Sequence, residues 1–181
     1  MAFIQALTSY LMSSLRSLLR LMSIKAKSVV LLHGVFNSRL FDLLKKKKAQ
    51  NIFVLEGRPN LEAAKISSKE LLKRKIKPTL IADNMAGFLF HKNLVKEAWL
   101  SYYFVDQKGA LCAIGALIVA VLAKQHKIKM NLFPTGGKTK FLGNPKDIFQ
   151  FLGVKVAPEN IRGYVPLVEW VDQKYIGKIY E

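Results

Sequence analysis

The chain has 181 residues, of which 51% are hydrophobic and 23% charged. This composition excludes a disordered chain and fits one domain with a buried core. Lysine and arginine number 29 against 12 acidic residues, and the net charge of +17 suits nucleic acid, anionic lipid or a phosphorylated metabolite as a partner. The basic residues are scattered along the sequence, which favours the simpler interpretation of solvated lysines on a basic protein.

The first 28 residues are predicted to form one amphipathic helix. Apolar residues recur there at helical spacing, and no acidic residue precedes Asp42. We expect this helix to dock on the following domain or on a second subunit. A transit peptide that targets an organelle and a helix that lies on a membrane surface are the alternatives.

From residue 29 onward, predicted strands and helices alternate. Short apolar runs bounded by polar or turn residues predict strands at 29–32, 52–55, 79–82, 99–105 and 128–133. Helices are predicted from 37 or 38 through the basic run Lys45–Lys48, at 61–75 with Leu71 and Leu72 facing inward, at 85–90 and at 109–124. The alternation predicts an α/β domain over 29–181, with a Rossmann-like parallel sheet and helices on both faces.

Cys112 is the single cysteine, so an intrachain disulfide is excluded and a reducing compartment is favoured. We therefore expect a cytoplasmic protein. The uncharged run from Gly109 to Ala123 is shorter than the roughly 20 residues of a membrane span. It is predicted to be a buried helix in which Cys112 is a core side chain.

Charged and polar residues follow two predicted strands, about one βαβ repeat apart. In a parallel sheet, the carboxyl ends of the strands form the edge where ligands bind. Arg58 follows one strand and is the best candidate for an anion contact, because its guanidinium suits phosphate; an ion pair with Glu56 or Glu62 is the alternative. Asp83 and Asn84 follow the next strand and either face sugar hydroxyls or cap the following helix.

The turn from Pro134 to Thr139 is rich in glycine but departs from a phosphate-binding loop, because Leu132 stands where that pattern has glycine. Lys138 could still contact an anion at this edge. His33, His91 and His126 are far apart in the sequence and lack carboxylate or cysteine neighbours at ligand spacing. The sequence therefore predicts no metal site and indicates no cofactor.

Two motifs resemble a known family. Glu56-Gly57-Arg58-Pro59 and Asp83-Asn84-Met85-Ala86-Gly87 are similar to motifs of the family that joins methylthioribose-1-phosphate isomerase, ribose-1,5-bisphosphate isomerase and the alpha, beta and delta subunits of translation initiation factor 2B. Ile114-Gly115 through Leu122-Ala123-Lys124 resembles the family's Ile-Gly helix, and 164–176 resembles its tail. The resemblance covers about 29–181 and is nearer to the isomerase branch.

The resemblance implies a dimerising Rossmann-like domain that holds a sugar phosphate at the strand ends. It also implies a cysteine and an aspartate as acid/base groups, and here the sequence departs. Gly34 stands where the family has the cysteine, and about Tyr102 where it has the aspartate, with Asp106 the nearest carboxylate. Glycine has no side chain with which to move a proton.

These departures favour a degenerate, non-catalytic relative of methylthioribose-1-phosphate isomerase that binds a sugar phosphate or nucleotide and forms a homodimer. One alternative is an active aldose–ketose isomerase whose acid/base groups have moved to Asp83 or Asp106. The other is a basic module that contacts RNA or a translation complex. The predicted ligand-binding residues are Arg58, Asp83, Asn84 and Lys138.

Overall fold

The computed structural model describes residues 5, 12, 24, 27–138, 140–151, 153–158 and 160–181. Most of the predicted N-terminal helix lies outside the described residues, so both that helix and the boundary near residue 28 stay predictions. Among the described residues, no helix combines the length and apolarity needed to cross a membrane.

The domain is built on a mixed sheet in which six strands run parallel. They occur in the order β10-β6-β4-β1-β2-β3. In chain order these strands are β1 (Val29–His33), β2 (Asn51–Leu55), β3 (Thr79–Ile81), β4 (Val95–Val105), β6 (Lys129–Pro134) and β10 (Lys178–Ile179). Two further strands, β5 (Gly109–Ala113) and β9 (Val168–Asp172), pair antiparallel beside β4. The predicted α/β class is confirmed.

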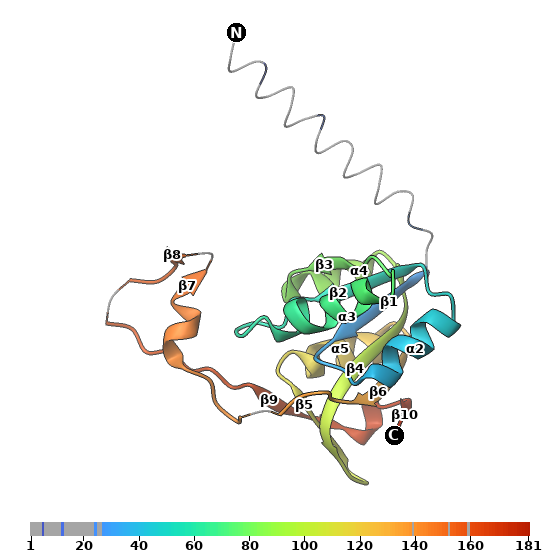
Figure 1. Cartoon of the computed structure of the whole chain (residues 1–181). Helices are drawn as coiled ribbons and strands as arrows, with labels where there is room; N and C mark the ends of the chain where they lie inside the picture. The colour runs from blue at the N-terminus through green and yellow to red at the C-terminus, as the bar shows by residue number, and fades with distance from the viewer. Residues whose placement is uncertain are drawn as a thin grey trace.

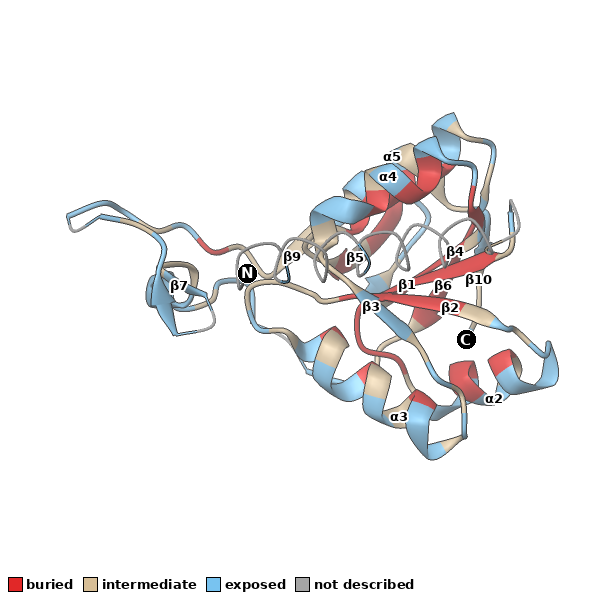
Figure 2. Cartoon of the chain, turned by 90° about the horizontal axis from the view of Figure 1, so that it is seen from above, coloured by how far each residue is buried: buried red, intermediate tan, exposed pale blue. Residues whose placement is uncertain are grey.

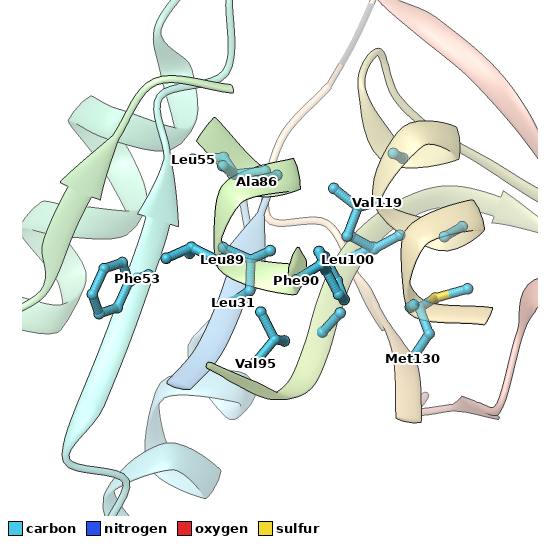
Figure 3. Close-up of a cluster of buried hydrophobic side chains, with 14 of the residues drawn as sticks. Leu31, Phe53, Leu55, Ala86, Leu89, Phe90, Val95, Leu100, Val119 and Met130 are labelled. Carbon is cyan, nitrogen blue, oxygen red and sulfur yellow. The ribbon is translucent and has the colours of Figure 1, made fainter. Parts of the chain in front are cut away.

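Helices cover both faces of the sheet (Figure 2). On one face lie α2 (Ser38–Lys46), the π-helical turn η1 (Ala63–Ser67) and α3 (Ser68–Lys73), with buried side chains packed against the strands. On the other lie α4 (Ala86–His91) and α5 (Ala116–Gln125). Figure 3 shows side chains of α4 and α5 meeting those of the strands in this second core cluster.

The prediction of one helix over 109–124 is wrong in its first part. Residues 109–113 form β5, and the helix begins only at Ala116, after Gly115 in the left-handed conformation at φ 94°. The cause is burial. Ala110 and Cys112 of β5 are fully buried, and a short continuous apolar run has no periodicity that separates a buried strand from a buried helix.

Two smaller expectations also need correction. Leu71 is buried as predicted, but Leu72 is 58% exposed, because only one of two consecutive helical positions faces the sheet here. The strand predicted at 79–82 ends at Ile81; this strand, β3, is the edge of the sheet, and its Leu80 is 53% exposed.

The structure also contains an arm, which we define as the described residues between 140 and 165. It includes the 3-10 helix η3 (Pro145–Ile148) and the short hairpin β7 (Gln150–Phe151) and β8 (Val154–Lys155). Figure 1 shows β7 and β8 projecting from the domain. The chain returns from the arm to form β9 and then β10, both of which are strands of the main sheet.

The helices α2, α3, α4 and α5 end in the same way. Each is followed by a residue with positive φ, namely Lys48, Lys75, Asn93 and Lys127. The next residue donates its N–H to a carbonyl five positions earlier, the pattern of a Schellman motif. Left-handed geometry costs a non-glycine residue roughly 1–2 kcal/mol, whereas a cation at a helix end gains about 0.3–1 kcal/mol. Glycine would therefore end these helices at lower cost than lysine.

Candidate functional site

A cavity of about 620 Å³ lies at the carboxyl edge of the sheet. The ends of β1 and β2, the segment before α5 and the first part of the arm surround it. Three cations and two carboxylates are among its polar lining residues, which are His33, Arg58, Asn60, Glu62, Tyr103, Lys138, Lys140, Asn144 and Asp147. Its size suits a small metabolite, and its excess of cations suits an anionic one.

The loop after β2 carries Arg58 into this cavity, and Asp83 holds the loop in place. One carboxylate oxygen of Asp83 accepts the Gly57 N–H at 2.9 Å, and the other accepts the Arg58 N–H at 2.7 Å. Hydrogen bonds to a charged acceptor are among the stronger ones in proteins. Because Asp83 is not part of the cavity lining, its contacts make it a positioning residue for the loop.

The guanidinium of Arg58 contacts the arm. Its central carbon lies over the Phe151 ring, 4.6 Å from the ring centroid, a cation–π contact. Within the described part of the chain, no carboxylate lies within ion-pair distance of Arg58. The ion pair with Glu56 or Glu62 considered from the sequence is therefore not formed, and the guanidinium N–H groups can donate to an anion.

Glu56 lies just before this loop, and the pKa of its carboxyl is raised above the ordinary 4.5. Burial is the main cause, the nearby charge of Asp83 adds to it, and Arg58 acts in the opposite direction. Glu56 does not belong to the cavity lining. It is therefore a carboxyl that holds a proton more readily than usual, next to the cavity but not in it.

The end of β1 and the residue that follows it also line the cavity. Gly34 has φ 105°, and a Cβ at this position would overlap the Ser101 Oγ. Ser101 thus fills the space that a side chain at position 34 would need. Its hydroxyl and the His33 Nδ1 are buried without a protein partner among the described residues. The other ring nitrogen, His33 Nε2, donates to the Ile114 carbonyl at 2.8 Å and so carries the hydrogen.

The remaining predicted site residues divide between the cavity and other parts of the domain. Lys138 lines the cavity, whereas Asn84 is exposed outside it. Asp106 closes the turn before β5, where its carboxylate accepts the N–H groups of Lys108 at 2.7 Å and Gly109 at 3.1 Å. The Tyr102 hydroxyl donates to the Tyr180 carbonyl at 3.0 Å. The structure therefore brings together Arg58 and Lys138, but not Asn84 or Asp106.

Cys112 is fully buried, and the pKa of its thiol is raised to about 12, mainly by burial and also by the charge of Glu169. A thiol with this pKa is not a nucleophile at neutral pH. Glu169, on the neighbouring strand β9, accepts the Leu117 N–H at 2.8 Å and so caps α5.

Two cavity features were not anticipated from the sequence. Tyr103, rather than Tyr102, lines the cavity, since successive residues of a strand point to opposite faces. Phe151 reaches Arg58 from far along the chain. No local pattern marks either contact, because both depend on how β4 and the arm are placed.

Comparison with known proteins identifies the family. A sequence model of the initiation factor 2 subunit family matches residues 18–179. The chain belongs to the initiation factor 2 subunit family. The family resemblance predicted from the motifs at 56–59 and 83–87 is confirmed.

Curated relatives of this family member carry the name methylthioribose-1-phosphate isomerase. The protein from Koribacter versatilis is 29% identical over 140 residues, which cover 71% of this chain and 40% of the relative. The protein from Desulfitobacterium hafniense is 31% identical over 144 residues, which cover 73% of this chain and 42% of the relative. The chain thus spans less than half the length of these relatives.

Solved structures of the same family share the fold. The delta subunit of translation initiation factor eIF-2B from A. fulgidus superposes with a TM-score of 0.72 at 18% identity, covering 83% of this chain and 51% of that one. The 5-methylthioribose 1-phosphate isomerase from Pyrococcus horikoshii OT3 gives a TM-score of 0.72 at 21% identity, covering 86% and 50%. At these identities, the likeness establishes the fold of this family member and nothing further.

Proposed function

We propose that this chain is a non-catalytic relative of methylthioribose-1-phosphate isomerase that binds a sugar phosphate or nucleotide in the cavity and forms a homodimer. The observation that carries the proposal is the backbone at Gly34. The resemblance implies a cysteine at this position, but the space for a side chain there is occupied by Ser101. The cavity keeps cations for a phosphate while lacking the expected acid/base group.

The alternative of an active isomerase with relocated carboxylates is less well supported. Both oxygens of Asp83 accept backbone N–H groups of the Arg58 loop, and one oxygen of Asp106 accepts two N–H groups of a turn. Neither residue lines the cavity. A general acid or base must reach the proton that it moves, and neither carboxylate has that access in this arrangement.

An assay of the purified chain with methylthioribose 1-phosphate tests the proposal. We expect no ketose product above the uncatalysed rate, because position 34 carries no proton-transfer group. Calorimetry on the same preparation should detect binding of methylthioribose 1-phosphate. Enzymatic ketose formation that disappears in Asp83→Ala or Asp106→Ala would show that the acid/base groups have moved, and the non-catalytic proposal would fail.

The homodimer is supported by the apolar surface of the arm. Large hydrophobic side chains are exposed there, including Phe141 at 71% and Tyr164 at 77%, together with Leu142, Val154, Val156 and Ile161. Several large apolar side chains exposed on one projecting segment are typical of an interaction site. We expect light scattering to give the mass of a dimer, for the full chain and for a form that starts at Ser28. A stable monomer in both would refute dimerisation.

A further inference from the structure

Lysines that are scattered in the sequence come together at the amino edge of the sheet, opposite the cavity. In a parallel sheet, every connection from a helix back to a strand returns to this edge. We define the basic edge as the segment before β1, the four connections after α2, α3, α4 and α5, and the helix and strand ends that adjoin these connections. It comprises residues 27–28, 45–50, 73–78, 92–97 and 124–129. These segments hold 14 of the 29 lysines and arginines but only one acidic residue, Glu97.

Most of this charge is not neutralised within the protein. Every lysine of the basic edge is exposed. Lys47 pairs with Glu97, Lys73 with Glu70, and Arg74 with Glu70 and Asp42. The other cations of the basic edge have no carboxylate partner in the described part of the chain. So many unpaired charges on one side create a strong positive potential that attracts a polyanion.

The way in which the helices end does not explain why lysine occupies these positions. Three of the four left-handed residues that end α2, α3, α4 and α5 are lysines, Lys48, Lys75 and Lys127. Glycine is the usual residue at such a position. The chain therefore carries a cation at three places where helix termination alone favours the absence of a side chain.

The dimensions and composition of the basic edge indicate the class of polyanion. The basic edge spans the amino ends of five neighbouring strands, β6, β4, β1, β2 and β3. At about 4.8 Å apart they give a length of roughly 19 Å, and that length of a nucleic acid duplex carries about 11 phosphate charges. The edge has no exposed large hydrophobic side chain, which a membrane-surface contact would use. It also has no Phe, Tyr or Trp on which a base could stack.

We propose that the basic edge binds the phosphate backbone of a nucleic acid without reading its sequence. This site lies at the amino edge of the sheet, whereas the cavity lies at the carboxyl edge, so the proposal does not depend on what the cavity binds. Contacts to phosphates position a protein on nucleic acid but carry no sequence information. Binding should therefore be strongly salt-dependent and similar for duplexes of different sequence.

The test uses the full chain and a fluorescently labelled RNA duplex of about two helical turns, with anisotropy measured between about 50 and 200 mM salt. An edge variant carries Lys45→Gln, Lys46→Gln, Lys75→Gln and Lys77→Gln. A control variant with the same net charge carries Lys65→Gln, Lys69→Gln, Lys108→Gln and Lys146→Gln, all at exposed positions outside the basic edge.

We expect the edge variant to bind the RNA duplex roughly 10- to 100-fold more weakly. The slope of the logarithm of its binding constant against the logarithm of the salt concentration should become shallower by about 0.9 for each phosphate contact removed. The control variant should change binding less than about threefold. Equal weakening in both variants would mean diffuse attraction to net charge and would overturn the proposal. Binding to vesicles rich in phosphatidylserine, without binding to RNA, would overturn it as well.

A second variant separates loss of charge from loss of structure. Replacing the three left-handed lysines in Lys48→Gly, Lys75→Gly and Lys127→Gly removes three cations where glycine fits the backbone better. We expect a melting temperature no lower than that of the parent chain, together with weaker RNA binding. If this variant binds RNA as tightly as the parent, the assignment of the basic edge is wrong.

Discussion

Replacing Arg58 with alanine should weaken binding of a sugar phosphate by roughly 10- to 150-fold. A charge-assisted contact between a guanidinium and a phosphate contributes about 1.5–3 kcal/mol, and that free energy corresponds to this change in Kd. The structure favours Arg58 for this contact because the Asp83 carboxylate holds its loop and the Phe151 ring lies beneath its guanidinium. Little side-chain freedom then remains to be lost on binding. Calorimetry with methylthioribose 1-phosphate or a nucleoside monophosphate measures the effect.

The control for Arg58→Ala is Lys46→Ala, which removes one positive charge at the other edge of the sheet. Lys46 lies at the end of α2 and is not part of the cavity lining. We expect this variant to bind the sugar phosphate as the parent chain does. Equal small losses in the two variants would mean that the ligand is attracted only by the overall charge, and the cavity would not be a specific site.

Replacing Trp99 with alanine should lower the free energy of unfolding by about 3–5 kcal/mol. Trp99 is fully buried on the central strand β4, and its ring stacks on Phe133 with centroids 4.8 Å apart. The indole N–H also donates to the Glu97 carboxylate at 2.8 Å. Truncation leaves a cavity and removes one donor from a partly buried carboxylate. Since domains of this size are stable by only about 5–15 kcal/mol, the loss should be visible in urea unfolding followed by circular dichroism.

The other tryptophan provides a matched control. Trp170 on β9 is 36% exposed, so a change to alanine removes less buried surface. We expect Trp170→Ala to cost less than about half of the Trp99→Ala effect, in line with the dependence of the cost on burial. A Trp99→Ala protein as stable as Trp170→Ala would show that the core around β4 rearranges to fill the space.

The hydrogen bonds around Glu97 explain why this side chain tolerates its partly buried place beside Trp99. The pKa of the Glu97 carboxyl is lowered below its ordinary value. Burial, the largest single cause, acts to raise this pKa, but the hydrogen bonds from Trp99 and Lys47 and the charge of Lys47 together outweigh burial. The carboxylate also accepts the Asn131 side-chain N–H at 3.2 Å. Glu97 is therefore charged at neutral pH, and because its pKa is lowered, its contribution to stability is present above the ordinary pKa and lost as the pH falls through the folded-state pKa.

The local sequence determined most of the parallel sheet. Runs such as 29–32 and 52–55 are apolar because β1 and β2 are covered by helices on both faces, and this burial makes them recognisable as strands. The motifs at 56–59 and 83–87 also indicated the family from the sequence, because they occupy junctions where the loops need particular residues. The hydrogen bonds from Gly57 and Arg58 to Asp83 account for the pairing of the two motifs.

The tertiary structure alone decided which residues act together. Whether 109–113 is a strand depends on β9, which comes more than fifty residues later and supplies the second partner. The contact between Arg58 and Phe151 depends on the path of the arm. The charge of the chain is fixed by its sequence, and along the sequence the lysines are scattered. They meet at one edge because parallel strands return every helix end to the same side of the sheet.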